Sequence, residues 1–435
     1  MTEGSTFRAI SRRGLLAGAG GVAALSALPG CSPGGGGTSD TIKFWNMPWG
    51  GTAFSPLDQK ITLAYKPSAG LPAASYQAVQ WANFTTTFAT AIVSKTGPAV
   101  SSGSGTQAFQ FAVKNYIAYA DGLLESWKKN GLYDDFLPGV LGSMKTDKGY
   151  VAIPYNLDMR VLWYRKSLLE KAGAKPPTDW QSYLDACGAL KKIGVFGLGI
   201  AAGAQSNGVH ALVGLLINNG GGLFNGEQQP DCVTPANIEA LEFVVELVRK
   251  GYMDPGSVSY STTNAQSQWK AGKFGMGFEG PGLDHFLGGA VEADMAVTDP
   301  LTGAQGGKGA LYFPNNIMMY RNTPSQKGSE AFLSYYYRNM TPLWTKKTGV
   351  GLPVLKSIAA TPEFRADRNA IAAVEKWLPI CKTWAAPGGD ALFANVSLVD
   401  STPAMTAFAQ SVLSLRATPK DALTTLQKTL TSQRN

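Results

Sequence analysis

Aromatic and amide side chains follow the first apolar segment that reads as a strand. Residues 41–45 form that segment, and Trp45, Asn46 and Trp49 come where the chain leaves it. Ligands of open α/β sheets gather at the carboxyl ends of strands, and indole rings offer a wide apolar face at little cost in rotamer entropy. These residues therefore predict noncovalent binding of a ligand with apolar faces and polar groups. The alternative is that Trp45 belongs to the core and Trp49 packs on its own turn.

Two further segments carry residue types suited to binding. Trp81 lies on a stripe of apolar residues spaced by three and four, which predicts a helix over residues 76–94. A side chain on such a stripe is either core or a ligand contact. Ser104 follows a strand that begins at Ala99 and lies where a helix opens. The backbone amides there suit hydroxyls or anions, although ordinary helix capping explains the same residues.

The residue types that most enzymes need are sparse. The only histidines are His210 and His285, and neither lies in a His-x-x-x-His motif or beside a carboxylate pair. No Gly-x-Ser-x-Gly sequence occurs, and Gly197-Leu198-Gly199 lacks the acidic residue that a dinucleotide site requires. We therefore expect no catalytic residue, no metal ion and no cofactor.

Composition bounds the class of protein. With 435 residues, 44% of them hydrophobic and 16% charged, the chain has the composition of a folded protein of more than one domain. The net charge of +8 is spread along the sequence without a long Lys/Arg block, which argues against nucleic-acid binding. Short apolar segments alternate with amphipathic helical patterns, and this alternation predicts α/β layers. Helix starts are expected at Thr178–Gln181, Thr234-Pro235, Thr402-Pro403 and Thr418-Pro419.

Residues 1–31 read as an export signal. The pair Arg12-Arg13 precedes a weakly apolar run, residues 15–28, that is too short to span a bilayer. Cys31 ends a lipobox-like Leu-Pro-Gly-Cys sequence, and a Gly-rich tether, residues 32–40, follows it. We therefore expect a lipid on Cys31 that holds the protein on the outer face of the cytoplasmic membrane. The alternative is plain signal cleavage nearby, with Cys31 a bystander.

Three cysteines follow Cys31, namely Cys187, Cys232 and Cys381. Their spacing fits no zinc site. Cys187 falls on the apolar side of a predicted helix, so we expect a buried thiol there. One disulfide among the three stays an open alternative in an oxidising compartment.

Short motifs follow one another between residues 97 and 354. Gly97–Val100 opens a strand after Gly-Pro, Gly149–Tyr155 ends in Ile-Pro-Tyr, and Gly272–Pro281 ends in Gly-Pro. The others are Ala118–Leu124, Leu162–Lys166, Pro176–Trp180 and Gly349–Val354. In order and spacing the series resembles the extracellular solute-binding proteins of ABC importers, the family of the maltose-binding protein. Gly282 stands where that family usually has a tryptophan.

This resemblance implies an α/β, two-lobed periplasmic-binding-protein type II fold with hinge crossovers and a ligand cleft between the lobes. It places lobe 1 at residues 41–153 plus 312–355 and lobe 2 at 154–311 plus 356–435. Family position adds a set of ligand-binding candidates beside the crossovers. They are Tyr155, Asn156, Asp158, Arg160, Phe278, Glu279, Gly280 and Asn315.

Residue chemistry leaves alternatives at several of these positions. Asp158 and Arg160 alternate with apolar neighbours, as on a strand with one polar face, and the two would equally suit a structural ion pair. Glu279 would equally suit a helix cap. Because Gly282 replaces the family's tryptophan, ring stacking there falls to Phe278.

The resemblance implies an extracellular monomer, not an enzyme, that captures a mono- or oligosaccharide by hinge closure and delivers it to the permease subunits of an ABC transporter. Two alternatives stay open. A phosphorylated polyol or other non-sugar solute would use Arg160 and the amides near Ser104. A secreted glycoside hydrolase would need a pair of carboxylates across the sugar, for which Asp158 and Glu279 are the candidates.

Overall fold

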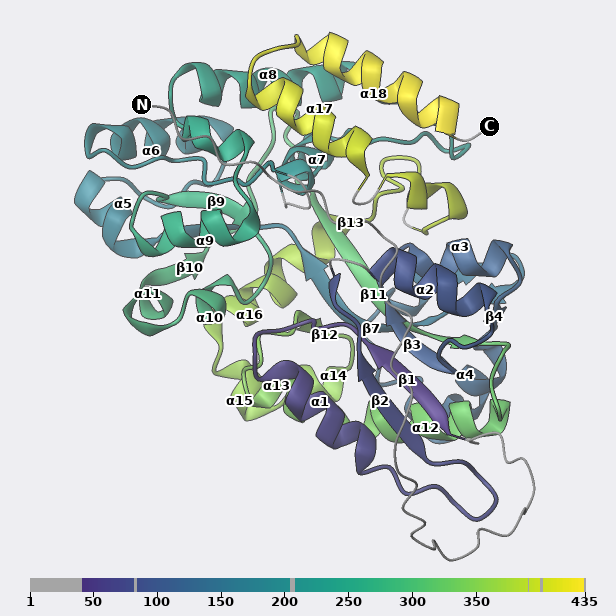
Figure 1. Cartoon of the computed structure of the whole chain (residues 1–435). Helices are drawn as coiled ribbons and strands as arrows, with labels where there is room; N and C mark the ends of the chain where they lie inside the picture. The colour runs from purple at the N-terminus through teal and green to yellow at the C-terminus, as the bar shows by residue number, and fades with distance from the viewer. Residues whose placement is uncertain (1–40, 82–83, 204–207, 390, 400–401, 434–435) are drawn as a thin grey trace, which may run out of the picture. The chain divides into compact units, whose positions relative to one another are not determined.

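The computed structural model describes residues 41–81, 84–203, 208–389, 391–399 and 402–433 (Figure 1). The predicted export signal, Cys31 and the tether lie outside the described residues. Within the described part of the chain, no helix is both long and apolar enough to cross a membrane. Helices and strands alternate, as predicted, and the strands form a large sheet, a small sheet and a two-stranded hairpin.

The large sheet contains β1 (Ile42–Asn46), β2 (Ala74–Ala78), β3 (Val100–Gly103), β4 (Ile117–Ala118), β7 (Ile153–Met159), β11 (Ala310–Tyr320), β12 (Leu352–Pro353) and β13 (Cys381–Lys382). Its main order is β12-β7-β11-β3-β1-β2, with β4 and β13 paired to β11. Strand β1 is parallel to β2 and β3, whereas β11 runs antiparallel to β3 and β7. The strands predicted at residues 41–45 and from Ala99 are therefore confirmed as β1 and β3.

Helices cover both faces of the large sheet because successive side chains of a strand point to opposite sides. Phe44 packs on Phe332 and Tyr336, with ring centroids 5.3 and 5.1 Å apart, while the next residue, Trp45, packs on Phe88 at 5.5 Å. Phe332 and Tyr336 belong to one helix and Phe88 to another, so the two helices lie on opposite faces. The helices of this region are α1 (Phe54–Leu63), α2 (Phe84–Val93), α3 (Gln107–Val113), α4 (Asp121–Lys128), α12 (Gln326–Asn339), α13 (Pro342–Thr345) and α14 (Lys356–Ala359).

The small sheet consists of β8 (Val161–Arg165), β9 (Met276–Glu279) and β10 (Met295–Val297), in the order β10-β8-β9. Since β7 ends at Met159 and β8 begins at Val161, the chain passes from the large sheet to the small sheet at Arg160. The helices around the small sheet are α5 (Lys166–Ala172), α6 (Trp180–Lys192), α7 (Gly208–Asn218), α8 (Pro235–Arg249), α9 (Thr262–Lys270), α10 (Leu283–Leu287) and α11 (Gly289–Asp294).

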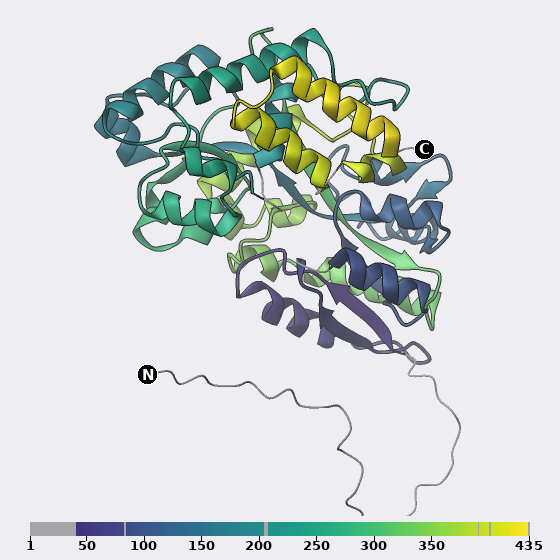
Figure 2. The same ribbon diagram turned by 45° about the horizontal axis from the view of Figure 1, so that its top comes forward.

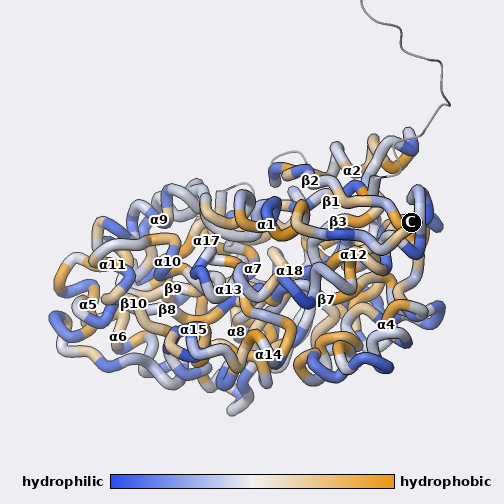
Figure 3. Tube along the Cα trace, turned by 90° about the horizontal axis from the view of Figure 1, so that it is seen from below, coloured by the Kyte–Doolittle hydropathy of each residue, from blue (hydrophilic) through white to orange (hydrophobic). Residues whose placement is uncertain are grey.

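The last two helices, α17 (Pro403–Leu413) and α18 (Pro419–Gln433), pack against α8, and α17 also contacts α7 (Figure 2). Hydrophilic segments gather at the periphery, for example near α4 and α5 (Figure 3). The cysteines Cys187 and Cys232 are buried and Cys381 is partly buried, and all three are free thiols. Burial raises the pKa of Cys232 to about 12, so this thiol stays protonated.

Two local expectations were wrong. Residues 74–78 form β2 instead of the start of a helix, because they pair with β1 along their whole length, and α2 begins only at Phe84. The cap of α6 is Asp179, which accepts from the Ser182 amide while Ser182 reaches back to the Asp179 amide. The cap at Thr234 is confirmed, and its side chain accepts from the Asn237 amide. The lobe boundaries stay a prediction.

Candidate functional site

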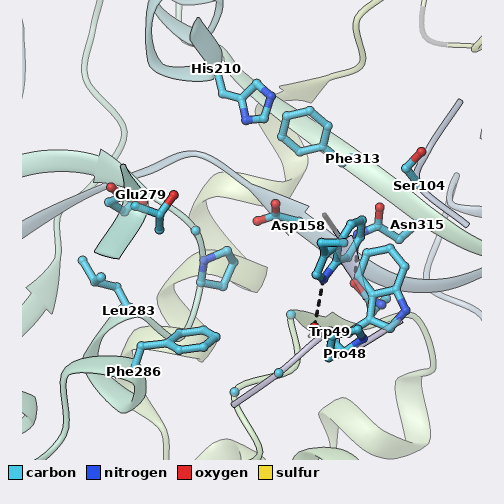
Figure 4. A pocket seen from close by; sticks show the side chains of 18 of the residues that line it. Pro48, Trp49, Ser104, Asp158, His210, Glu279, Leu283, Phe286, Phe313 and Asn315 are labelled. Carbon is cyan, nitrogen blue, oxygen red and sulfur yellow. Dashed lines mark hydrogen bonds between the residues drawn. The ribbon is translucent and has the colours of Figure 1, made fainter. Parts of the chain in front are cut away.

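A cavity of about 410 Å³ is lined by residues from both sheets and from the helices beside them (Figure 4). Residues of the large-sheet region on its wall are Pro48, Trp49, Gly50, Trp81, Phe84, Ser104, Asn156, Asp158, Phe313, Asn315, Gly349 and Gly351. Those from the chain between β7 and β8 and from the small-sheet region are Arg160, His210, Thr262, Gln266, Glu279, Gly280, Pro281, Leu283 and Phe286. We call this cavity the central pocket.

An aromatic corner forms one wall of the central pocket. The rings of Trp49 and Trp81 meet edge to face, with centroids 4.8 Å apart at 89°, and Phe84 packs on Trp81 at 5.5 Å. The Trp81 indole N–H donates to the Pro48 carbonyl at 3.0 Å, although 39% of the side chain is exposed. Phe286 of α10 lies across the pocket from Trp49 (Figure 4). Apolar ring faces therefore border the pocket on two sides.

A charged network closes the pocket where β7 gives way to β8. Arg160 Nη1 donates to Asp158 Oδ1 at 2.7 Å, and Arg160 Nη2 lies 2.9 Å from His210 Nδ1. A guanidinium only donates, so His210 Nδ1 accepts and the ring proton sits on Nε2. The guanidinium also stacks over the Phe313 ring, 4.9 Å from its centroid. Arg160 is 4% exposed, so its guanidinium interacts with these partners and has little contact with solvent.

Gly280 lets the chain pass close to this network. A methyl group added at Gly280 would lie 3.1 Å from Asp158 Oδ1 and 3.5 Å from Arg160 Nη1. The first distance is shorter than an ordinary contact, so only glycine leaves the Asp158 carboxylate undisturbed. Gly282, in place of the family's tryptophan, has φ of +78° at the start of α10, a backbone conformation that larger residues disfavour.

Two buried amides supply hydrogen-bonding groups on the β7–β11 pair. Asn315 Nδ2 donates to Asn156 Oδ1 at 3.0 Å, which orients the Asn156 amide. Asn156 is 1% exposed and its Nδ2 has no hydrogen-bond partner among the described residues. A buried donor without a partner costs about 1–3 kcal/mol. Because Asn156 lines the pocket, a ligand oxygen would satisfy this donor.

The structure brings most of the predicted residues to the pocket wall. Those that line it are Trp49, Trp81, Ser104, Asn156, Asp158, Arg160, Glu279, Gly280 and Asn315. Glu279 ends β9 and does not cap α10, and Trp81 precedes α2 instead of lying on a helical stripe. Their contact with a ligand stays a prediction.

Four predicted residues lie behind the wall, and strand alternation explains three of them. Tyr155 points to the opposite face of β7 from Asn156, where its hydroxyl lies 3.0 Å from that of Tyr336. Phe278 points away from Glu279 and packs near Tyr183, and Trp45 packs on α2 as described above. The fourth is Asn46, which is fully buried and bonds to Trp49 and Asp58.

Several wall residues lie outside the predicted set. No neighbouring motif marks His210 in the sequence, and only the fold places it beside Arg160. Phe313 carried a usable signal, since it precedes Asn315 by two residues and so shares a strand face with it. Phe286 and Leu283 gave no signal, because a short helix with apolar residues resembles core.

A second group of ionisable residues lies behind α10. His285 Nδ1 is 2.9 Å from Glu292 Oε1 and His285 Nε2 is 2.7 Å from Asp367 Oδ2, with the buried Asp284 next to it. The hydrogen bond to Asp367, together with the nearby carboxylates, raises the pKa of His285 to about 9 against the effect of burial. Asp284, His285 and Asp367 have the separation of metal ligands, but both ring nitrogens face carboxylates, which favours a doubly protonated imidazolium.

A family profile and a crystal structure of a known protein are both similar to this chain. The sequence profile of the family described as bacterial extracellular solute-binding protein matches residues 73–341. A crystal structure of a sugar transporter from Arthrobacter chlorophenolicus A6, solved with bound laminaribiose, is 47% identical to this chain. It covers 90% of this chain and 99% of its own, with a TM-score of 0.84.

More distant proteins are also similar to this chain in structure or in sequence. The GacH receptor of Streptomyces glaucescens, solved without ligand and with acarbose, is 21% identical and covers 90% of this chain and 98% of its own, with a TM-score of 0.74. A binding protein of Brucella abortus (strain 2308) is 24% identical over 275 residues, 61% of this chain and 65% of the relative. The matched region thus spans about two thirds of the length of that curated relative.

These likenesses confirm the expected α/β, two-lobed fold. The relatives are binding proteins and transporter components. The family profile matches more than half of the sequence, and the alignment with the 47% identical structure includes nearly all of that protein. The chain therefore belongs to the bacterial extracellular solute-binding proteins.

Proposed function

We propose that this chain captures a neutral oligosaccharide outside the cell and delivers it, chemically unchanged, to the permease subunits of an ABC importer. The arrangement of the central pocket carries the proposal. Ring faces of Trp49, Trp81 and Phe286 border it, and the unpartnered Asn156 Nδ2 lies among further polar groups. A sugar offers apolar C–H faces to such rings and hydroxyls to such groups.

The charges on the wall favour a neutral ligand. Among the described residues that line the pocket, Arg160 is the only one with a permanent positive charge, and it already bonds to Asp158. Asp158 and Glu279 are both acidic wall residues. A phosphate or carboxylate on the ligand would face these acids without a cation of its own. The phosphorylated-polyol alternative therefore lacks support from the geometry.

The relative from Arthrobacter chlorophenolicus A6 was solved with laminaribiose, a disaccharide of glucose. At 47% identity this makes a glucose disaccharide the first ligand to test. The chain passes between the two sheets at Arg160, on the pocket wall, so a small rotation there would open or close the pocket around its ligand. The predicted lobes, residues 41–153 plus 312–355 and 154–311 plus 356–435, would be the moving parts.

Export and anchoring complete the proposal. The twin-arginine sequence would direct the chain across the cytoplasmic membrane, and a lipid on Cys31 would anchor it to the outer face of that membrane. The anchored protein would act as a monomer. Globomycin-sensitive processing and mass spectrometry of the mature N-terminus would test this part. An unmodified N-terminus beyond Cys31 would contradict it.

Isothermal titration calorimetry of the purified chain tests the ligand. We expect laminaribiose to bind at a single site, and its phosphorylated analogue to bind at least tenfold more weakly, because the phosphate would meet Asp158 and Glu279. Chromatography of the same samples should show intact disaccharide, since the proposal includes no hydrolysis. Equal affinity for both sugars, or release of glucose, would contradict the proposal.

A further inference from the structure

A buried carboxylate lies behind the aromatic corner of the pocket. Asp58 of α1 is fully buried and does not line the pocket. Its Oδ2 accepts from Asn46 Nδ2 at 2.6 Å, and its Oδ1 accepts from the Tyr336 hydroxyl at 2.5 Å. The other titratable groups that face it are the hydroxyls of Tyr76 on β2, which acts to lower the pKa of Asp58, and Tyr155 on β7. None of these groups carries a positive charge.

Asn46 connects this carboxylate to a ring of the pocket. The Trp49 indole N–H donates to Asn46 Oδ1 at 3.0 Å and also lies 3.1 Å from Ser102 Oγ. An ionised carboxylate can only accept, so it holds the NH₂ group of Asn46 toward Asp58. The carbonyl oxygen of the same amide must then face the Trp49 indole. The charge on Asp58 thus fixes which end of the Asn46 amide meets Trp49.

We propose that Asp58 is a positioning residue that sets the orientation of Trp49 through Asn46, so that ligand binding by the pocket depends on the protonation of Asp58. This inference rests on the proposed function for its binding readout. Its structural half, the link between Asp58 and the Trp49 indole, needs no ligand.

The local environment places the titration of this group near physiological pH. Burial raises the pKa of Asp58 to about 6, against the opposing hydrogen bonds from Tyr336 and Asn46. A protonated carboxyl is a weaker acceptor than a carboxylate and can itself donate, so it releases the Asn46 amide to rotate. The rotated amide would turn its NH₂ group toward the Trp49 indole, where two donors would oppose each other. Trp49 would then lose one of its two acceptors.

The first experiment follows Trp49 without ligand. In the purified chain labelled with [¹⁵N]indole tryptophan, the indole resonance that disappears in Trp49→Phe identifies Trp49. We expect its chemical shift to titrate with a midpoint near pH 6 in the wild type. In Asp58→Asn, which is neutral at every pH, this step should be absent. In Tyr336→Phe the midpoint should rise, because a hydrogen bond that favours the ionised form is gone. Tyr335→Phe is the matched control, since that hydroxyl donates to the Ile61 carbonyl and should leave the midpoint unchanged.

The second experiment measures laminaribiose affinity by calorimetry at pH 5 and pH 7.5. The wild type should bind about fivefold more weakly at pH 5, the difference expected between hydrogen bonds to neutral and to charged acceptors. Asp158 and Glu279 also face the ligand, so the diagnostic quantity is the change relative to Asp58→Asn. In that variant the ratio of the affinities at pH 7.5 and pH 5 should be about fivefold smaller than in the wild type. Asp147→Asn, which changes an exposed residue, should keep the wild-type ratio.

The outcomes separate the two ideas. If laminaribiose does not bind but the Trp49 resonance titrates and moves with Tyr336→Phe, the proposed ligand is wrong and the role of Asp58 stands. If the resonance does not titrate between pH 5 and pH 7.5, or keeps its wild-type midpoint in Tyr336→Phe, the positioning role is overturned. Should Asp58→Asn fail to fold, the Tyr336→Phe midpoint still decides the question.

Discussion

Replacing Gly280 by alanine tests the polar side of the pocket with the smallest change available. The new methyl group would sit 3.1 Å from Asp158 Oδ1 and 3.5 Å from Arg160 Nη1. The carboxylate must therefore yield by a few tenths of an ångström or leave its position 2.7 Å from Arg160. In either case it no longer meets a ligand hydroxyl in the same place. A hydrogen bond to a charged group contributes about 1.5–3 kcal/mol, so we expect Gly280→Ala to weaken sugar binding by about tenfold or more.

A matched control uses the same substitution where space is open. Gly122 lies in α4, and nothing lies within 4 Å of a methyl group added there. Gly122→Ala should leave affinity unchanged and raise the free energy of unfolding by about 0.5–1 kcal/mol, because alanine favours a helix over glycine. Binding is measured by calorimetry with laminaribiose and folding by thermal unfolding without ligand. Wild-type affinity in Gly280→Ala, with an intact fold, would refute the assignment of Asp158 to the ligand.

Three further changes probe the pocket and the two buried ionisable groups. Asn156→Ala removes the unpartnered donor and should weaken laminaribiose binding by about fivefold to a hundredfold, whereas the exposed Asn322→Ala should not; equal calorimetric affinities would exclude Asn156 from the site. Asp58 has its pKa raised from 3.8 to about 6, so its ionisation costs stability as pH rises through that window. In urea titrations the unfolding free energy of the wild type relative to Asp58→Asn should fall by about 2.4 kcal/mol from pH 4 to pH 7, and a constant difference would contradict this. His285 has its pKa raised from 6.5 to about 9, so the stability contributed by its charged form is complete below pH 6.5 and is lost as pH rises through 9. The unfolding free energy of the wild type relative to His285→Gln should therefore fall by about 3 kcal/mol over that range, and equal pH profiles of the two proteins would disprove the imidazolium assignment.

Local sequence patterns determined much of the fold. The apolar run at residues 41–45 became β1, and Thr234-Pro235 opened α8, because strand and cap signals depend on a few adjacent residues. The alternation of Asp158 with apolar neighbours correctly indicated a strand with one polar face. The ordered motifs between residues 97 and 354 sufficed to predict the family that the comparisons confirm.

Only the tertiary structure decided which faces meet at the pocket. Alternation shows that Tyr155 and Asn156 point apart, but packing against α12 determines that the tyrosine faces away from the pocket and the asparagine lines it. His210 reaches Arg160 across 50 residues of sequence, and residues 74–78 became a strand because β1 offered a partner edge. These outcomes depend on contacts between segments distant in the chain, and periodicity within one segment carries no information about its partner.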